Sequence, residues 1–180
     1  FLTQNRMSDP TISVSPEMTK ARVFADVESF LQKLELRFVS TDQTRPWGGF
    51  YVIDETQAEQ FAAIFFPELK LEDLRISGKL SPKILIVQAG KRLSWQYHFR
   101  RAEIWKAIGG KSGVVTSDTD TEGPLTTLWP GQVISLTQGQ RHRLIGLDTW
   151  GVVAEIWQHT DPANPSDESD IVRLQDDFGR

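Results

Sequence analysis

The hydrophobic pattern divides the chain into an N-terminal part with helical spacing and a longer part made of strand-like runs. Over about residues 20–35 apolar residues recur every three or four positions, which predicts an amphipathic helix. A second helix is expected over about residues 56–66, where it ends before Pro67. The aromatic and β-branched run 50–53 between them has the composition of a strand. Residues 20–79 therefore read as a helical elaboration of the domain.

From about residue 80 the pattern changes to short runs rich in β-branched and aromatic residues, separated by glycine- and proline-containing turns. Such spacing is typical of an antiparallel sandwich or barrel, and eight strands suit a jelly roll. We therefore expect a mainly β fold with N-terminal α-helices. The eight runs are Lys83–Val87, Leu93–Phe99, Glu103–Ile108, Gly113–Ser117, Leu125–Leu128, Val133–Leu136, His142–Gly146 and Gly151–Gln158.

The two ends of the chain lack a regular pattern. Residues 1–19 are rich in Ser, Thr and Pro, which predicts a flexible arm. Residues 161–180 are acidic and contain prolines, and we expect this tail to wrap the exterior or the rim of the barrel. The remainder, residues 20–180, is expected to be a single domain whose barrel spans about residues 80–160.

Composition excludes several classes of protein. With 39% hydrophobic residues among 180, the chain can build one core, and it has no cysteine for disulfides or thiolate ligands. The net charge of −4 argues against nucleic acid as a partner. The longest apolar run, residues 61–66, is too short to cross a bilayer, and no signal peptide is recognised, so we expect a cytoplasmic protein without a membrane partner.

One group of polar residues falls on the inward face of the predicted barrel. Strand alternation places Gln96 and His98 on one face, and Glu103 opens the next run. Burying these groups would be costly unless a partner satisfied them, and a metal ion can do so for amide, imidazole and carboxylate together. His142, just past a turn on a distant run, is the expected fourth ligand. Gln96, His98, Glu103 and His142 therefore form a candidate divalent-metal site.

The two stretches that carry these residues resemble the paired motifs of the cupin superfamily. The first reads Gly-x5-Gln-x-His-x4-Glu-x6-Gly and the second Gly-x5-Thr-x-Gly-x2-His, so every spacing agrees. Two positions depart from the usual motif: Thr137 replaces a proline of a turn, and Gln96 replaces the first histidine ligand. The resemblance implies a jelly-roll barrel with one bound metal ion.

A glutamine in the first ligand position resembles the cupin domain of type II mannose-6-phosphate isomerases. The similarity continues in Arg101-Ala-Glu103-Ile-Trp105, in Arg45-Pro-Trp-Gly48 and in the tail from Asp170 to Arg180, and covers about residues 45–180. The helical elaboration resembles small bacterial cupins described as phosphoheptose or mannose-6-phosphate isomerase-like. The resemblance implies a sugar phosphate as substrate, one divalent metal (zinc first, with manganese, cobalt, iron or nickel as alternatives), and a homodimer.

Isomerisation of a sugar phosphate needs a base and cations besides the metal. Lys83 and Glu155, on two barrel strands, are the candidates for the base. Arg173 in the tail is the candidate for binding phosphate or an enediolate oxygen, because a guanidinium forks onto such groups. Trp47 and Trp105 are weighed as ligand contacts, Trp105 because it shares the inward face of Glu103.

Other charged and aromatic residues near the motifs receive simpler interpretations. Trp95 faces outward on its strand and is expected beneath a helix, and His159 is expected on the surface or in a loop. The arginines that flank the ligands are expected to form a solvated rim, with one of them still a candidate for binding phosphate. They are Arg100, Arg101, Arg141 and Arg143.

Two other functions remain open from the sequence. Cupin ligand sets also support oxygen chemistry, so a different metal enzyme such as an iron or nickel dioxygenase is an alternative, which an oxygen-uptake screen would detect. The other alternative is a non-catalytic sugar-binding module in which the metal is only structural. Loss of folding on metal removal, without any catalytic activity to restore, would favour it.

Overall fold

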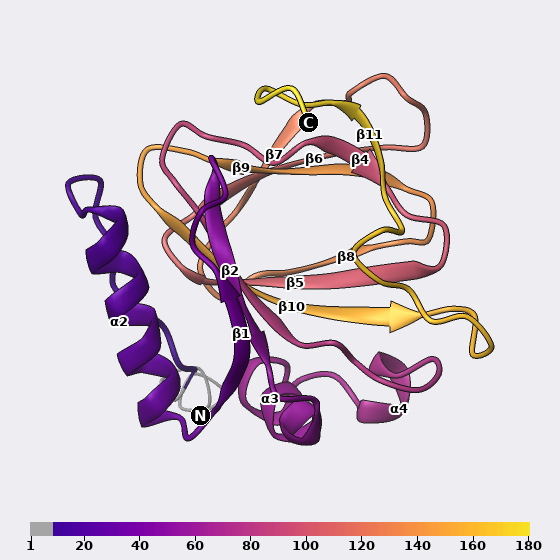
Figure 1. Cartoon of the computed structure of the whole chain (residues 1–180), viewed down its shortest axis with the longest axis horizontal. Coiled ribbons are helices and arrows are strands. Elements are labelled where there is room, and N and C mark those ends of the chain that lie inside the picture. The colour runs from indigo at the N-terminus through magenta and orange to yellow at the C-terminus, as the bar shows by residue number, and fades with distance from the viewer. Residues whose placement is uncertain (1–8) are drawn as a thin grey trace.

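The computed structural model describes residues 9–180, which form two antiparallel β-sheets that face each other, with helices outside one of them (Figure 1). Both sheets are antiparallel throughout, so the expected mainly β fold with N-terminal helices is confirmed. The larger sheet has the order β1 (Phe38–Asp42), β2 (Gly48–Ile53), β3 (Lys83–Val87), β10 (Gly151–His159), β5 (Arg101–Gly109), β8 (Val133–Leu136). The smaller sheet has the order β11 (Val172–Gln175), β4 (Trp95–Tyr97), β9 (Arg141–Gly146), β6 (Ser112–Ser117), β7 (Leu125–Leu128).

The helices form where the apolar periodicity predicts them. Helix α2 (Lys20–Lys33) starts at Thr19, whose hydroxyl accepts a hydrogen bond from the Arg22 amide at 3.1 Å. A short 3₁₀ turn, η1 (Glu55–Gln57), leads into α3 (Ala58–Phe65), which ends before Pro67. The one-turn helix α4 (Leu71–Leu74) was not predicted, because four residues are too few to establish a period.

The larger sheet separates two apolar clusters. Its outer face packs against α2, α3 and α4, with residues such as Phe61 and Phe65 fully buried. Its inner face packs against the smaller sheet through a second cluster that includes Trp105 and Leu144. Alternation along the strands explains the division: on β5, Ile104 and Ile108 join the outer cluster, while Glu103, Trp105 and Ala107 point into the barrel. The inner face is therefore the one that carries polar chemistry.

Residues 9–19, expected to belong to a flexible arm, instead lie against the outer cluster. The Ile12 amide donates a hydrogen bond to the Ile108 carbonyl at 2.8 Å, and Ile12, Val14 and Met18 are partly buried. The Trp150 indole also donates to the Met18 carbonyl at 2.9 Å, and the three apolar residues follow no regular period that would predict this packing. The rest of the predicted arm, residues 1–8, lies outside the described residues.

The tail forms a strand that was not predicted. After β10 the chain turns back and β11 pairs with β4, so that the C-terminal segment lies beside the smaller sheet in Figure 1. Arg173 pairs in register with Gln96, which places the tail at the edge of the candidate site. Within residues 9–180, none of the helices has the length and apolar character that a membrane span requires.

Candidate metal centre

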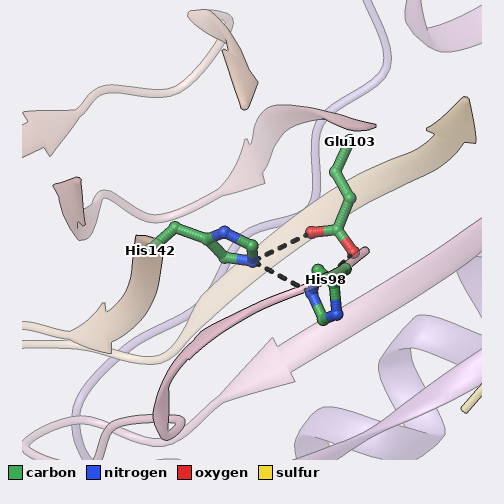
Figure 2. Close-up of side chains that lie close together, drawn as sticks. All are labelled: His98, Glu103 and His142. Atoms are coloured by element: carbon green, nitrogen blue, oxygen red, sulfur yellow. Dashed lines mark hydrogen bonds and ion pairs between the residues drawn. The ribbon is translucent and has the colours of Figure 1, made fainter. Parts of the chain in front are cut away.

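Three of the four predicted ligands converge inside the barrel. His98 follows β4, His142 lies on β9 and Glu103 lies on β5 of the opposite sheet, so the two sheets contribute from both sides. Their ligand atoms lie within 4.8 Å of one another, and all three residues are buried (Figure 2). His142 Nε2 lies 3.3 Å from both His98 Nε2 and Glu103 Oε1, and His98 Nε2 lies 3.5 Å from Glu103 Oε2.

Hydrogen bonds at the far side of each imidazole ring fix which nitrogen faces the cluster. His98 Nδ1 lies 2.7 Å from the Asp170 carbonyl oxygen, and His142 Nδ1 lies 3.0 Å from the Gln140 carbonyl oxygen. A carbonyl can only accept, so each Nδ1 must carry the hydrogen. In the neutral ring the lone pair is then on Nε2, directed at the other two residues of the cluster.

The cluster is therefore a set of acceptors with too few donors. Burial lowers the pKa of His98 to about 4, so its ring is neutral at physiological pH. Burial alone would raise the pKa of Glu103, but the neighbouring Arg101 guanidinium holds it well below its usual range. Glu103 Oε1 is buried and accepts no hydrogen bond from any described group. Two imidazole lone pairs and a carboxylate around one point fit a divalent cation, which would satisfy all of them.

Arg101 supplies the positive charge next to the cluster. Its Nε donates to Glu103 Oε2 at 2.8 Å, and its Nη2 lies 3.3 Å from His98 Nε2. The guanidinium is buried, stacks at 3.6 Å over the Trp157 ring, and donates to Ser166 Oγ at 2.9 Å. A cation bound by His98 would take over the Arg101 contact to Nε2, while the contact to Glu103 Oε2 could remain.

Gln96 lies next to the cluster, and its role as a ligand stays a prediction. It is directly opposite His142 in the pairing of β4 with β9, and it lines the same pocket as Glu103. Its Oε1 accepts a hydrogen bond from Ser94 Oγ at 2.6 Å. Turning the amide oxygen toward a metal would therefore break a bond to a neighbour that is itself buried.

The three residues predicted to act on substrate line one pocket of about 560 Å³, part of which is open to solvent. Lys83 and Glu155 are buried neighbours in the pairing of β3 with β10, whereas Arg173 is exposed. The structure thus places Lys83, Glu155 and Arg173 together with Gln96 and Glu103. Trp47 and Trp105 also line this pocket, as do two further arginines, Arg45 and Arg180.

Glu155 is a carboxyl group held in place by two indoles. Trp105 Nε1 donates to its Oε2 at 2.7 Å, and Trp157 Nε1 donates to its Oε1 at 3.0 Å. Burial, together with the negative charge of Glu103, raises the pKa of Glu155 to about 7 against the opposing effect of Lys83. A group with this pKa can both take up and release a proton near neutral pH.

The raised pKa of Glu155 predicts a specific pH dependence of stability for the metal-free protein. The folded state keeps the proton up to about pH 7, whereas an unfolded glutamate loses it near pH 4.5, so the free energy of unfolding should fall as pH rises between these values. The expected fall is about 3 kcal/mol. In Glu155→Gln this part of the pH dependence should vanish, which urea unfolding of both proteins at pH 5 and pH 8 will measure. An identical change in both proteins would contradict it.

Several simpler interpretations of the sequence are wrong. Arg101 and Arg143 are buried rather than part of a solvated rim, and His159 is buried between Ser81 and Ser166. Trp95 faces away from the pocket as expected, but it lies beneath the loop that contains Asp120, to whose carbonyl its indole donates, and not beneath a helix. Strand alternation could have found Arg101 and His159, because both fall on the inward face once β5 and β10 are given their full lengths.

Comparison with known proteins identifies the family of this chain. Residues 56–176 match the family model described as "Mannose-6-phosphate isomerase C-terminal". No curated protein sequence matches the chain.

Among solved structures, the R92A mutant of oxalate decarboxylase from Bacillus subtilis matches 75% of this chain with a TM-score of 0.54 and 13% identity. The match spans only 30% of that enzyme, so this chain is much shorter than it. A DMSP lyase structure matches 84% of this chain and 69% of its own, with a TM-score of 0.50 and 11% identity. At such identities the likeness shows a shared fold and nothing of the reaction. The chain is a cupin, and it belongs to the mannose-6-phosphate isomerase C-terminal family.

Proposed function

We propose that the protein is a metal-dependent aldose–ketose isomerase that acts on a sugar phosphate. The observation that carries this proposal is Glu155, a carboxyl group with a pKa of about 7 that lines the same pocket as Glu103 of the metal cluster. Isomerisation requires one group that removes a proton from carbon and returns it to the neighbouring carbon. Membership of the mannose-6-phosphate isomerase C-terminal family supports the same reaction class.

The metal would be held by His98, Glu103 and His142, with Gln96 as the proposed fourth ligand. A bound divalent ion supplies Lewis-acid polarisation of the substrate carbonyl, which makes the adjacent C–H bond more acidic. The imidazole and carboxylate ligands suit zinc first, and manganese, cobalt, iron or nickel as alternatives. Because Glu103 would be engaged with the metal and Glu168 is paired with Lys83, Glu155 is the pocket carboxylate left for proton transfer.

In this scheme Glu155 takes the proton from C2 and delivers it to C1, while a hydroxyl proton passes from O2 to O1. The atoms balance without an oxidant or a second substrate. Lys83 forms an ion pair with Glu168 and lies 4.6 Å from the ring centroids of Phe50 and Trp157. We therefore assign Lys83 an electrostatic role beside the developing negative charge, in place of the role of base.

The phosphate would bind at the outer end of the pocket. Arg173 is exposed there, and its guanidinium forms no ion pair with any of residues 9–180. Partial desolvation, and then repulsion from Arg180 and Arg45, lower the pKa of Arg173 against the opposing effects of Asp176 and Glu168. A dianionic phosphate would relieve this repulsion, and a guanidinium forks onto it with two parallel hydrogen bonds.

An isomerase assay tests the proposal. The full chain, loaded in turn with zinc, manganese or cobalt, is incubated with mannose 6-phosphate, sedoheptulose 7-phosphate or unphosphorylated mannose in D₂O. We expect a phosphorylated substrate to form its isomer and to take up deuterium at the exchanging carbon, which NMR detects. Glu155→Gln should retain the metal and lose activity by at least about 100-fold, whereas Glu59→Gln, on the outside of α3, should match the wild type.

The outcomes separate the alternatives. Metal binding without isomer or deuterium uptake for any sugar excludes an isomerase. Oxygen consumption by the iron-loaded protein would then favour a dioxygenase, and sugar binding without turnover would favour a binding module.

A further inference from the structure

We propose that the tail segment 166–173 is a strap that positions His98 for metal binding, with Asp170 as its positioning residue, so that metal binding and docking of the tail are coupled. The segment is the second half of the connection from β10 to β11, together with the first two residues of β11, and this connection crosses from the larger sheet to the smaller one (Figure 1). The inference rests on the metal site of the proposed function, and not on the isomerase reaction.

Asp170 contacts the metal cluster through its backbone. Its carbonyl oxygen accepts the hydrogen bond from His98 Nδ1 at 2.7 Å, and this bond keeps the lone pair of the neutral ring on Nε2. The residue is buried, so water cannot readily replace the carbonyl as the acceptor. Partners of this kind behind a ligating histidine orient the ring and typically change metal affinity 10–100-fold when lost.

The side chain of Asp170 holds the chain that follows His98. Its Oδ1 accepts from the Phe99 amide and its Oδ2 from the Arg100 amide, each at 2.9 Å. Ser166 Oγ also donates to Oδ2 at 2.7 Å. One carboxylate thus satisfies the two backbone amides after His98 and sets where β4 ends and the turn to β5 begins. The tail therefore determines both the tautomer and the position of this imidazole.

The same strap also contacts the Arg101 guanidinium beside the metal cluster, and it forms one side of the pocket. Ser166 Oγ and the Asp167 carbonyl oxygen accept from Arg101 Nη1, at 2.9 and 3.1 Å. Glu168, Ile171 and Arg173 from the strap line the pocket. With the tail undocked, His98 would lose its Nδ1 acceptor, Arg101 two of its acceptors, and the pocket one wall. Docking of the tail therefore completes both the metal site and the substrate pocket.

This arrangement has a thermodynamic consequence. If the docked tail raises metal affinity by some factor, bound metal must stabilise the docked tail by the same factor. We expect that factor to be 10–100-fold, the range for loss of a partner behind a ligating histidine. Metal binding should therefore slow tryptic cleavage after Arg173, because Arg173 is paired with Gln96 in the sheet and its cleavage requires the undocked tail.

The experiment compares Asp170→Ala with Asp177→Ala in the full chain. Asp177 also ties the tail to the barrel, through an ion pair with Arg92 at 2.6 Å, but it contacts neither His98 nor Arg101. Zinc affinity is measured by isothermal titration, and tail cleavage by limited proteolysis with and without zinc. Asp170→Ala keeps the backbone carbonyl but removes the carboxylate that holds the Phe99 and Arg100 amides, so the tail should undock and take the carbonyl away from His98. We therefore expect 10–100-fold weaker zinc binding and loss of zinc protection of the tail. For Asp177→Ala we expect affinity within about twofold of the wild type and protection retained.

A merely structural role for Asp170 would give a different result. The variant would then be less stable, but the folded protein would bind zinc with unchanged affinity, and zinc would still protect its tail; that result overturns the proposal. If Asp170→Ala does not fold, Asp170→Asn, which keeps one side-chain acceptor, carries the same comparison.

A readout without metal separates this inference from the proposed function. The ¹⁵N shifts of His98 in the metal-free protein should report the Nδ1–H tautomer in the wild type, and a mixture of tautomers in Asp170→Ala. A wild type that binds none of zinc, manganese, cobalt, iron and nickel would refute the metal-dependent isomerase and, with it, the coupling. Coupled zinc binding without isomerase activity would refute the isomerase and leave the strap intact.

Discussion

His142→Ala should weaken divalent-metal binding by more than about 100-fold while the barrel stays folded. The substitution removes one of the three groups whose ligand atoms lie within 4.8 Å of one another, and loss of a ligand should exceed the 10–100-fold effect of losing its supporting partner. It leaves Arg101 paired with Glu103, so no buried charge becomes uncompensated. The measurement is zinc titration of chelator-treated protein, with metal content determined after dialysis.

Arg141→Ala is the matched control for this substitution. Arg141 precedes His142 on β9, but its guanidinium stacks over Tyr97 at 3.8 Å and pairs with Asp120 at 2.8 Å, away from the cluster. The metal affinity of Arg141→Ala should equal that of the wild type. If His142→Ala binds zinc with the affinity of the wild type, His142 is not a ligand and the zinc site lies outside this cluster.

Glu103→Ala should lower the free energy of unfolding of the metal-free protein by about 3–5 kcal/mol. The carboxylate is the counter-charge of the Arg101 guanidinium, at 2.8 Å, and both side chains are buried. Removing it leaves a buried cation without an anion, which costs far more than the pair itself contributes. Urea unfolding at pH 7 in the presence of a chelator gives the value.

The sign of the pH dependence adds a check. Because the pKa of Glu103 is held well below its usual range, its stabilisation is present above the pKa of an unfolded glutamate and is lost as pH falls through the folded-state pKa. The difference in the free energy of unfolding between the wild type and Glu103→Ala should therefore shrink in acid.

The double variant Arg101→Met/Glu103→Met should recover most of the stability, since no unpaired charge remains. A double variant as unstable as Glu103→Ala would assign the loss to packing instead.

The sequence predicted the barrel well because its strands are short β-branched and aromatic runs that are bounded by turn residues. The runs Lys83–Val87, Leu125–Leu128 and Val133–Leu136 coincide with β3, β7 and β8, and the others differ by a few residues at their ends. The two motifs located His98, Glu103 and His142 because fixed spacing on paired strands places them on one inward face.

Other features depend on contacts that no local pattern records. The tail carries no detectable period, since β11 has only four residues, none of them fully buried, and it is held in place by pairing with β4. Arg101 reads as a solvent-facing residue until the strand is extended by two positions, because only the ion pair with Glu103 makes its burial tolerable. The role of Asp170 requires a contact to His98 across 72 positions of sequence.

The larger sheet has one further implication, for the way its chemistry can be changed. The larger sheet lies between two apolar clusters. The strands that direct Glu103 and Glu155 into the barrel therefore pack on their outer face, through residues such as Ile104 and Ile156, against the helices. Side chains in close-packed interiors transmit small changes of volume to their neighbours. Selection for altered substrate preference would therefore find useful substitutions in the outer cluster, between the larger sheet and the helices, at positions that do not contact the substrate.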